Sequence, residues 1–241
     1  MDGGVLLVHG GMCTSSCWSP VAERLALPVI AVDLPGRGSR RCDLLEVSLD
    51  DCVRTVLECA DDAGWRRFAL VGHSLGGVTV TETAHRCPDR ITHLVYVGAL
   101  IPGPGQGGCG LAYGADWPAG EIATIDEGVA RAMFGNDLTD DQWATWWPSF
   151  VPEAPRLMNA RLSGYPNGVP TTYVGLTDDV AVPPTLWDEM TSHLPGPVDR
   201  RQIDAGHMVM WSKPTELAAL LSELLTESLL TQTTSAPSAP R

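Results

Sequence analysis

Ser74 is the residue of this sequence whose surroundings most clearly indicate chemistry. It is the middle residue of Gly72-His73-Ser74-Leu75-Gly76, a G-x-S-x-G pattern. The apolar stretch 67–72 (RFALVG) predicts a buried strand before it, and 75–86 predicts a helix after it. Glycines on both sides permit a sharp turn that exposes the serine hydroxyl and directs the helix N-terminus at the reacting centre. This context favours a nucleophilic serine over a glycine-rich turn without catalysis.

Motifs elsewhere in the chain accompany this pentapeptide in a fixed order. They are Val8-His9-Gly10-Gly11, Asp33–Ser39 (DLPGRGS), Gly72–Gly77 (GHSLGG), Asp179–Pro183 (DVAVP) and Ala205–Met208 (AGHM). On these motifs the sequence resembles the α/β-hydrolase superfamily. The chain begins almost at its HG strand and contains the run GHMVMWSKPTEL at 206–217, which is similar to the methylesterase and hydroxynitrile lyase branch. The resemblance implies the α/β-hydrolase fold and a Ser-His-Asp triad.

The resemblance implies that His207 is the base for Ser74. A serine hydroxyl is a poor nucleophile at neutral pH and needs a base within hydrogen-bond reach. Among six histidines, His207 follows the last expected strand and is flanked by Gly206, at the position of the family's base. We interpret the other histidines as packing or surface residues.

The acid of the triad is either Asp178 or Asp179. A carboxylate must hold the imidazole in the correct tautomer, and only one of two adjacent side chains can point inward. Relatives place the acid four residues before a proline, which matches Pro183 and favours Asp179. Counting from Gly175 as a G-x-x-D pattern would instead select Asp178.

The same resemblance implies an oxyanion hole made of backbone N–H groups. Two preorganised donors are needed to stabilise the negative oxygen of a tetrahedral intermediate. The expected donors are the backbone N–H groups of Leu75, directly after the serine, and of Gly11, in the loop after the HG motif.

Alternating strand and helix patterns predict how these residues are positioned. The expected strands are 4–8, 28–34, 67–72, 91–97, 171–176 and a weaker, edge-like 198–203. Helical patterns occupy 48–63, 75–86, 184–194 and 214–229. This alternation predicts an α/β fold with a mostly parallel sheet of about six strands flanked by helices.

One long segment interrupts the alternation. Residues 101–168 are rich in glycine and proline and contain four of the eight tryptophans. We interpret them as a cap inserted into a core formed by 1–100 and 169–230, lying over the carboxyl edge of the sheet where ligands bind. Residues 231–241 are rich in Ser, Thr, Pro and Ala, which predicts a disordered tail.

Aromatic residues of the cap predict an apolar or aryl substrate. We select Trp143 and Trp147 as substrate-binding candidates, together with Trp18 after the HG loop, which matches an aromatic residue of the methylesterase branch. The wider aromatic set of the cap contains Trp117, Phe134, Trp146 and Phe150.

Charge and cysteine content indicate which classes of partner and which location in the cell to expect. A formal net charge of −13 argues against nucleic acid or anionic membranes as partners. Seven scattered cysteines and no basic-apolar leader predict a cytoplasmic protein with reduced thiols, and no metal or cofactor motif is found. We expect a monomer or a homodimer.

The reaction class is inferred from the residues around the motifs. Serine at position 74 argues against relatives that use an aspartate nucleophile, and Gly10 and Met208 replace the threonine and lysine typical of hydroxynitrile lyases. Hydrolysis of a small methyl ester, aryl ester or lactone is therefore expected. The alternatives are a tailoring hydrolase of a carbon–carbon bond or thioester, a cofactor-free oxygenase or cyclase, and a receptor-like protein with little turnover.

Overall fold

The computed structural model describes residues 3–230, with side chains up to Thr226. Its six strands form one parallel sheet in the order β2-β1-β3-β4-β5-β6. The strands are β1 (Val5–Val8), β2 (Val29–Val32), β3 (Phe68–His73), β4 (Ile91–Val97), β5 (Thr171–Leu176) and β6 (Asp199–Ile203). The predicted α/β fold with a parallel sheet of about six strands is therefore confirmed, and β6 is an edge strand as expected.

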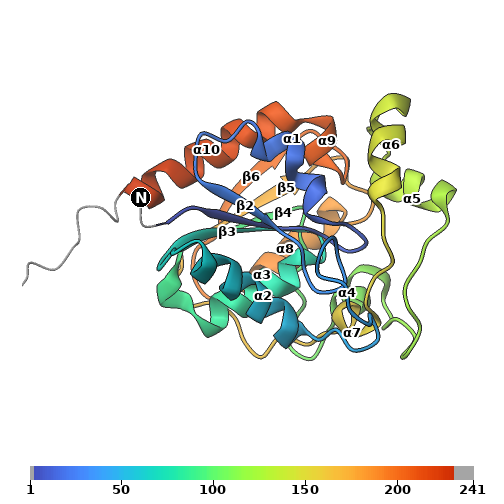
Figure 1. Cartoon of the computed structure of the whole chain (residues 1–241), viewed down its shortest axis with the longest axis horizontal. Helices are drawn as coiled ribbons and strands as arrows, with labels where there is room; N and C mark the ends of the chain where they lie inside the picture. The colour runs from blue at the N-terminus through green and yellow to red at the C-terminus, as the bar shows by residue number, and fades with distance from the viewer. Residues whose placement is uncertain (1–2, 231–241) are drawn as a thin grey trace, which may run out of the picture.

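Helices cover both faces of the sheet. The α-helices are α1 (Ser19–Ala22), α2 (Leu49–Asp62), α3 (Gly76–Arg86), α4 (Gly108–Tyr113), α5 (Glu127–Phe134), α6 (Asp140–Trp146), α7 (Pro155–Met158), α8 (Trp187–Ser192), α9 (Val209–Ser212) and α10 (Pro214–Leu230). Short 3₁₀ helices span Ser15–Trp18, Pro88–Arg90, Trp147–Ser149 and Pro184–Leu186. Figure 1 shows α1, α9 and α10 on one face of the sheet and α2, α3 and α8 on the other.

Alternation along the strands divides the core into two layers. In β1, Leu6 and Val8 pack into the cluster on the side of α2 and α3, and Val5 and Leu7 into the cluster that contains Leu217 of α10. Successive side chains of a strand point to opposite faces, so a strand that is buried on both faces is apolar throughout. This is why the central strands read as continuous runs of Val, Leu and Ile.

Local signals define the ends of α2. The Ser48 side chain accepts a hydrogen bond from the Asp51 N–H, and the Asp51 carboxylate accepts one from the Ser48 N–H, which forms a capping box. Gly64 follows the helix with φ +71°, a conformation that glycine adopts without strain. The predicted helix 184–194 is shorter in the structure, because a 3₁₀ helix precedes α8.

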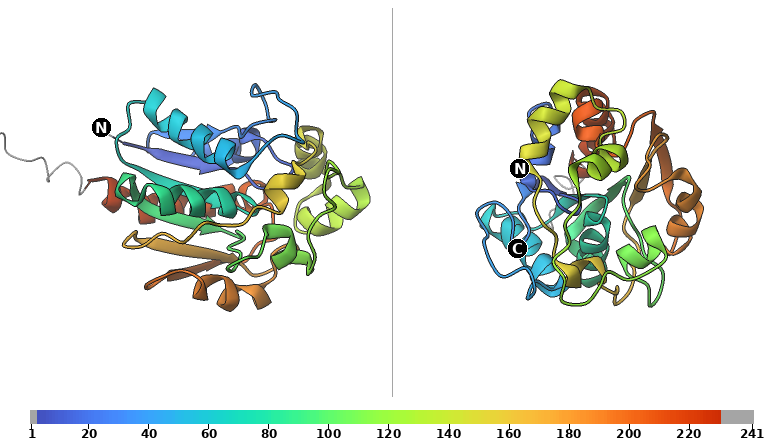
Figure 2. Two further views of the ribbon diagram at one scale, coloured as in Figure 1. Left: turned by 90° about the horizontal axis from the view of Figure 1, so that it is seen from below. Right: turned by 90° about the vertical axis from the view of Figure 1, so that its right-hand side faces the viewer.

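The parallel arrangement brings all the strand-following loops of interest to one edge. Val8 of β1 pairs with Gly72 of β3, and Leu176 of β5 pairs with Ile203 of β6, so their carboxyl ends are aligned. Helices α4 to α7, all within 101–168, gather beyond this edge in Figure 1 and in the left panel of Figure 2. The segment that we interpret as a cap thus lies over the ends of the strands.

One prediction from the sequence concerns residues outside the described range. The predicted disordered tail, 231–241, lies outside the described residues. Within residues 3–230, no helix combines the length and the apolar character that crossing a membrane requires.

Candidate active site

Ser74 occupies the sharp turn between β3 and α3. Its φ is +51°, in the left-handed region that side chains other than glycine rarely adopt. Gly76 permits close contact with the β1 loop, since a Cβ at this position would lie 2.5 Å from the His9 carbonyl oxygen. The strained backbone and the close packing together hold the hydroxyl of Ser74 at the carboxyl edge of the sheet.

Ser74, His207 and Asp179 form one hydrogen-bonded series. The His207 Nε2 atom lies 3.0 Å from the Ser74 Oγ atom, and the His207 Nδ1 atom lies 2.8 Å from the Asp179 Oδ2 atom. His207 is on the loop between β6 and α9, and Asp179 is on the loop after β5. An imidazole that donates from Nδ1 to a carboxylate keeps Nε2 free to accept the serine proton.

The structure distinguishes the two adjacent aspartates. Asp179 is 3% exposed, and its Oδ1 atom accepts hydrogen bonds from the Ala181 and Val182 N–H groups, each at 2.8 Å. Asp178 is exposed, and its backbone carbonyl accepts a hydrogen bond from the Asn136 side chain of segment 101–168. Of the two side chains, the one that points inward to the histidine is that of Asp179.

The buried histidines near Ser74 have a different environment. Burial lowers the pKa of His9 to about 4, and burial together with the nearby His207 lowers the pKa of His73 well below its usual value. The His73 Nε2 atom lies 2.9 Å from the His207 carbonyl oxygen, so a neutral His73 donates there and supports the histidine loop. Both side chains are packing groups, as the sequence indicated.

The two expected oxyanion donors lie beside each other. Leu75 immediately precedes α3, and a Cβ built on Gly11 would lie 3.3 Å from the Leu75 Cδ2 atom. A Cβ on Gly10 would lie 2.7 Å from the Ser74 Cβ atom, so the glycine loop packs directly against the serine. Within residues 3–230, no protein acceptor takes up the N–H of Leu75 or Gly11. Both donors therefore remain free to bind a ligand oxygen.

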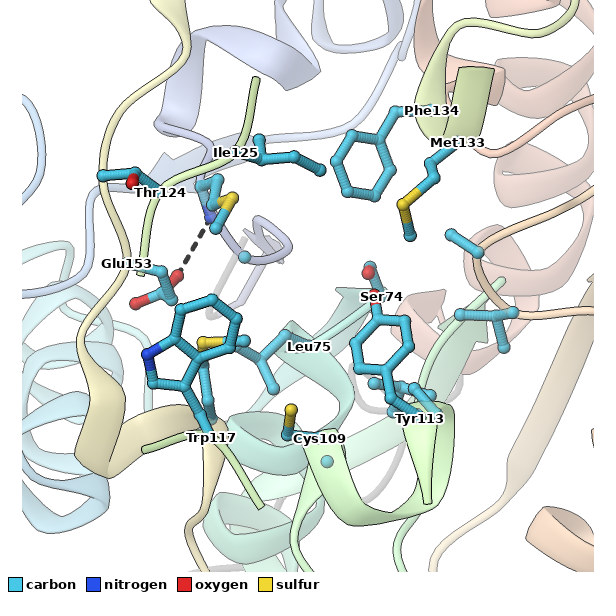
Figure 3. A pocket seen from close by; sticks show the side chains of 18 residues that line it. Ser74, Leu75, Cys109, Tyr113, Trp117, Thr124, Ile125, Met133, Phe134 and Glu153 are labelled. Carbon is cyan, nitrogen blue, oxygen red and sulfur yellow. Dashed lines mark hydrogen bonds between the residues drawn. The ribbon is translucent and has the colours of Figure 1, made fainter. Parts of the chain in front are cut away.

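An apolar cavity of about 300 Å³ opens at Ser74 (Figure 3). In the close-up, Tyr113, Met133 and Phe134 surround the serine, and Glu153 and Trp117 lie across the pocket from it. Glu153 is the only carboxylate in its lining. Burial raises the pKa of the Cys109 thiol, so this cysteine is a neutral group in the wall. The lining further includes Leu100, Ile125, Met158 and Val182.

The predicted aromatic binding residues require a correction. Trp143 and Trp147 lie outside the pocket lining, and their rings stack on each other with centroids 5.2 Å apart. Trp143 is buried, and the half-buried Trp147 packs against the same hydrophobic cluster. Trp18 is fully buried, and its ring makes a T-shaped contact with the ring of His73. Large aromatic side chains in a small segment bury most area by packing together, whereas Trp117 and Phe134 face the cavity.

Four polar residues that sequence reasoning missed connect segment 101–168 to the loops around Ser74, Asp179 and His207. The Asn136 side chain donates a hydrogen bond to the Asp178 carbonyl oxygen, and the Gly206 N–H donates one to the Asp137 carboxylate at 2.6 Å. Glu153 forms a buried ion pair with Arg37 and accepts a hydrogen bond from Met12. Arg37 and Glu153 are 116 residues apart, so no local pattern could have paired them. Among the described residues, no cluster of His, Cys, Asp or Glu is arranged to hold a metal ion.

The chain is similar to known proteins over nearly all of its length. It is 26% identical to a pyrethroid hydrolase of Sphingobium wenxiniae, with 91% of this chain and 86% of that protein covered. It is 27% identical to methylesterase 7 of Arabidopsis thaliana, with 91% and 95% covered. A solved Arabidopsis methylesterase superposes with a TM-score of 0.78 at 23% identity, covering 94% of this chain and all 100% of that one.

The family comparison agrees with these relatives. Residues 5–220 match the family model described as the alpha/beta hydrolase family. The expected resemblance to that superfamily, on its methylesterase side, is thereby confirmed. The chain belongs to the alpha/beta hydrolase family and is an esterase-type hydrolase.

Proposed function

We propose that this protein is a serine carboxylic ester hydrolase that forms an acyl-enzyme on Ser74. The observation that carries the proposal is the series from Ser74 Oγ through His207 to Asp179, with distances of 3.0 and 2.8 Å, at the end of an apolar pocket. A nucleophile, a base and a carboxylate that orients the base are what acyl transfer by serine requires.

The first half-reaction forms the acyl-enzyme. The Ser74 oxygen bonds to the ester carbonyl carbon while its proton moves to His207 Nε2, and the carbonyl electron pair becomes an oxyanion. When the carbonyl re-forms, the bond to the alkoxide breaks and His207 returns the proton to it, so that an alcohol leaves. Asp179 stabilises the imidazolium that exists between these steps.

Water completes the cycle. His207 takes a proton from a water molecule, whose oxygen bonds to the acyl carbon and displaces the Ser74 oxygen. The proton passes to Ser74, and the carboxylic acid is released. In both half-reactions the N–H groups of Leu75 and Gly11 serve as the oxyanion hole, which stabilises charge that develops only in the transition state. These steps need no metal or organic cofactor.

Pocket chemistry supports a neutral, apolar substrate. The lining consists mainly of Leu, Ile, Val, Met and aromatic side chains, and its one carboxylate, Glu153, is already paired with Arg37. A charged substrate would lose its hydration here without gaining a partner. We therefore propose a small methyl or aryl ester, or a lactone. Relatives named pyrethroid hydrolase and methylesterase support this substrate class.

We propose that the chain is divided into a catalytic core and a cap. Residues 1–100 and 169–230 form the catalytic core and 101–168 form a cap that selects the acyl or alcohol group. The cap supplies Trp117, Met133 and Phe134 to the pocket wall, and the core supplies Ser74 and the donors of the oxyanion hole.

Turnover of p-nitrophenyl acetate and butyrate by the wild type and by Ser74→Ala tests the proposal. We expect steady release of p-nitrophenol by the wild type, an acyl adduct on Ser74 by mass spectrometry, and a loss of at least about 10³-fold in kcat in the variant. An active Ser74→Ala protein would contradict the mechanism. A wild-type adduct that forms once and is not hydrolysed would contradict the hydrolase function and favour a receptor-like role.

A further inference from the structure

Met12, directly after the glycine loop, is held on both sides of its backbone by the cap. Its N–H donates to the Glu153 Oε2 atom at 3.0 Å, and its carbonyl accepts the Val151 N–H at 3.0 Å. Met12 has φ +59°, a conformation that costs energy for a residue with a side chain. A strained residue keeps such a conformation only when its surroundings hold it there, and these two hydrogen bonds do so.

Glu153 is itself fixed from three directions. Its Oε1 atom accepts hydrogen bonds from the Arg37 guanidinium and from the Ala154 N–H, and its backbone pairs with Ala123 in both directions. Glu153 and Arg37 are each 1% exposed. A buried carboxylate with these partners holds one geometry, because moving it would leave buried donors without acceptors.

The position of this carboxylate matters because of its neighbour in the chain. The Glu153 Oε2 atom lies 3.5 Å from where a Cβ on Gly11 would be, so it is adjacent to the proposed oxyanion donor. Fixing the Met12 N–H fixes the orientation of the Gly11–Met12 peptide, and with it the backbone on which the Gly11 N–H is carried. Arg37 neutralises a negative charge that would otherwise oppose the developing oxyanion.

We propose that Glu153, paired with Arg37, is a positioning residue for the oxyanion hole. By binding the Met12 N–H it keeps the Gly11 N–H directed at the reacting carbonyl, so the hole is complete only while the cap segment around Glu153 is docked on the glycine loop. The inference rests on the proposed serine esterase function. Glu153 touches no reacting atom in this role; it acts through Met12 and Gly11.

The test compares Glu153→Gln and Glu153→Asp with Glu82→Gln as a matched control. Glutamine cannot accept from Arg37, Ala154 and Met12 at once, because one of its two terminal atoms is a donor. Aspartate is too short to reach Met12 while it stays paired with Arg37. Because it keeps the negative charge, the buried guanidinium of Arg37 is not left unpaired, and this variant therefore serves if the glutamine variant folds poorly. Glu82 is also a buried carboxylate, bonded to Arg86 and Ser163 away from the pocket.

The measurements separate transition-state from ground-state binding. Folded, competent enzyme is counted by end-point labelling with a fluorophosphonate. We then measure kcat and KM on p-nitrophenyl butyrate, and Ki for an alkyl trifluoromethyl ketone, whose serine hemiketal uses the oxyanion hole. For both Glu153 variants we expect kcat to fall about ten- to a hundredfold and KM to change less than about threefold. The Ki for the ketone should rise by the same factor by which kcat/KM falls.

The outcomes separate the inference from the function beneath it. If wild type turns over and binds the ketone while both Glu153 variants match Glu82→Gln, the positioning role is refuted and the esterase function stands. A rise in KM with unchanged kcat would show that Glu153 acts only as part of the pocket wall that it lines, and would also overturn the inference. If the wild-type enzyme neither turns over nor binds the ketone, the proposed function fails and the inference fails with it.

Discussion

Replacing Asp179 with asparagine changes one atom of the hydrogen-bonded series, and the neighbouring hydrogen bonds determine how the new amide is oriented. The Asp179 Oδ1 atom accepts the Ala181 and Val182 N–H groups, so an asparagine must place its carbonyl oxygen there. A flipped amide would lose both bonds, worth about 1 kcal/mol each, and set donors against donors. The NH₂ group then occupies the position of Oδ2, 2.8 Å from the His207 Nδ1 atom.

That arrangement forces the wrong imidazole tautomer. An NH₂ group donates to Nδ1, so the histidine proton moves to Nε2, the atom that must accept the proton of Ser74. The variant also lacks the negative charge that stabilises the imidazolium. We expect kcat to fall by about 10³ to 10⁴, equivalent to about 4 to 5.5 kcal/mol of transition-state stabilisation, with KM little changed.

The neighbouring aspartate supplies the control. Asp178→Asn makes the same chemical change on an exposed side chain, and its kcat/KM should stay within about twofold of the wild type. Both variants are assayed on p-nitrophenyl butyrate at pH 7, with circular dichroism to verify folding. Wild-type activity in Asp179→Asn, or a large loss in Asp178→Asn alone, would refute the assignment of Asp179 as the acid.

Three further outcomes test other parts of the site. Trp117→Ala should change KM and acyl-chain preference, because it enlarges the pocket. Trp143→Ala should instead leave a cavity in the core and lower the free energy of unfolding by about 3 to 5 kcal/mol, as measured by chemical denaturation. Equal effects of the two variants would contradict the assignment of Trp117, and not Trp143, to the pocket lining. Asp137→Ala removes the acceptor of the Gly206 N–H, so kcat should fall about tenfold while exposed Asp141→Ala leaves it unchanged. Burial lowers the pKa of His9 to about 4 from 6.5, so between these values the unfolded chain binds the extra proton. The stability of the wild type should therefore fall by about 3 kcal/mol more than that of His9→Gln as pH drops from 6.5 to 4; parallel curves would refute this.

Much of the fold was predictable because its signals are local. The continuous apolar character of β1 and β3 follows from burial on both faces, and the capping box at Ser48 defines the start of α2 from four adjacent residues. The turn at Ser74 requires glycines that are its close neighbours in the chain. Each of these features is specified by residues within one or two turns of each other.

The location of the protein in the cell and its oligomeric state stay predictions. The predicted location followed from seven scattered cysteines and the lack of a basic-apolar leader.

The sequence by itself determined the parallel α/β architecture, the position of the proposed nucleophile and the order of the loops that follow the strands. The tertiary structure decided which side chains of 101–168 face Ser74. Tryptophans of this segment either stack together, as Trp143 and Trp147 do, or line the cavity, as Trp117 does, and the residue type alone does not distinguish the two. The tertiary structure alone brought Arg37 to Glu153 across 116 residues, and Asp137 to the histidine loop. Residue spacing encodes preferences over a few neighbours, whereas these contacts exist only once the sheet has aligned its carboxyl ends and the inserted segment has packed over them.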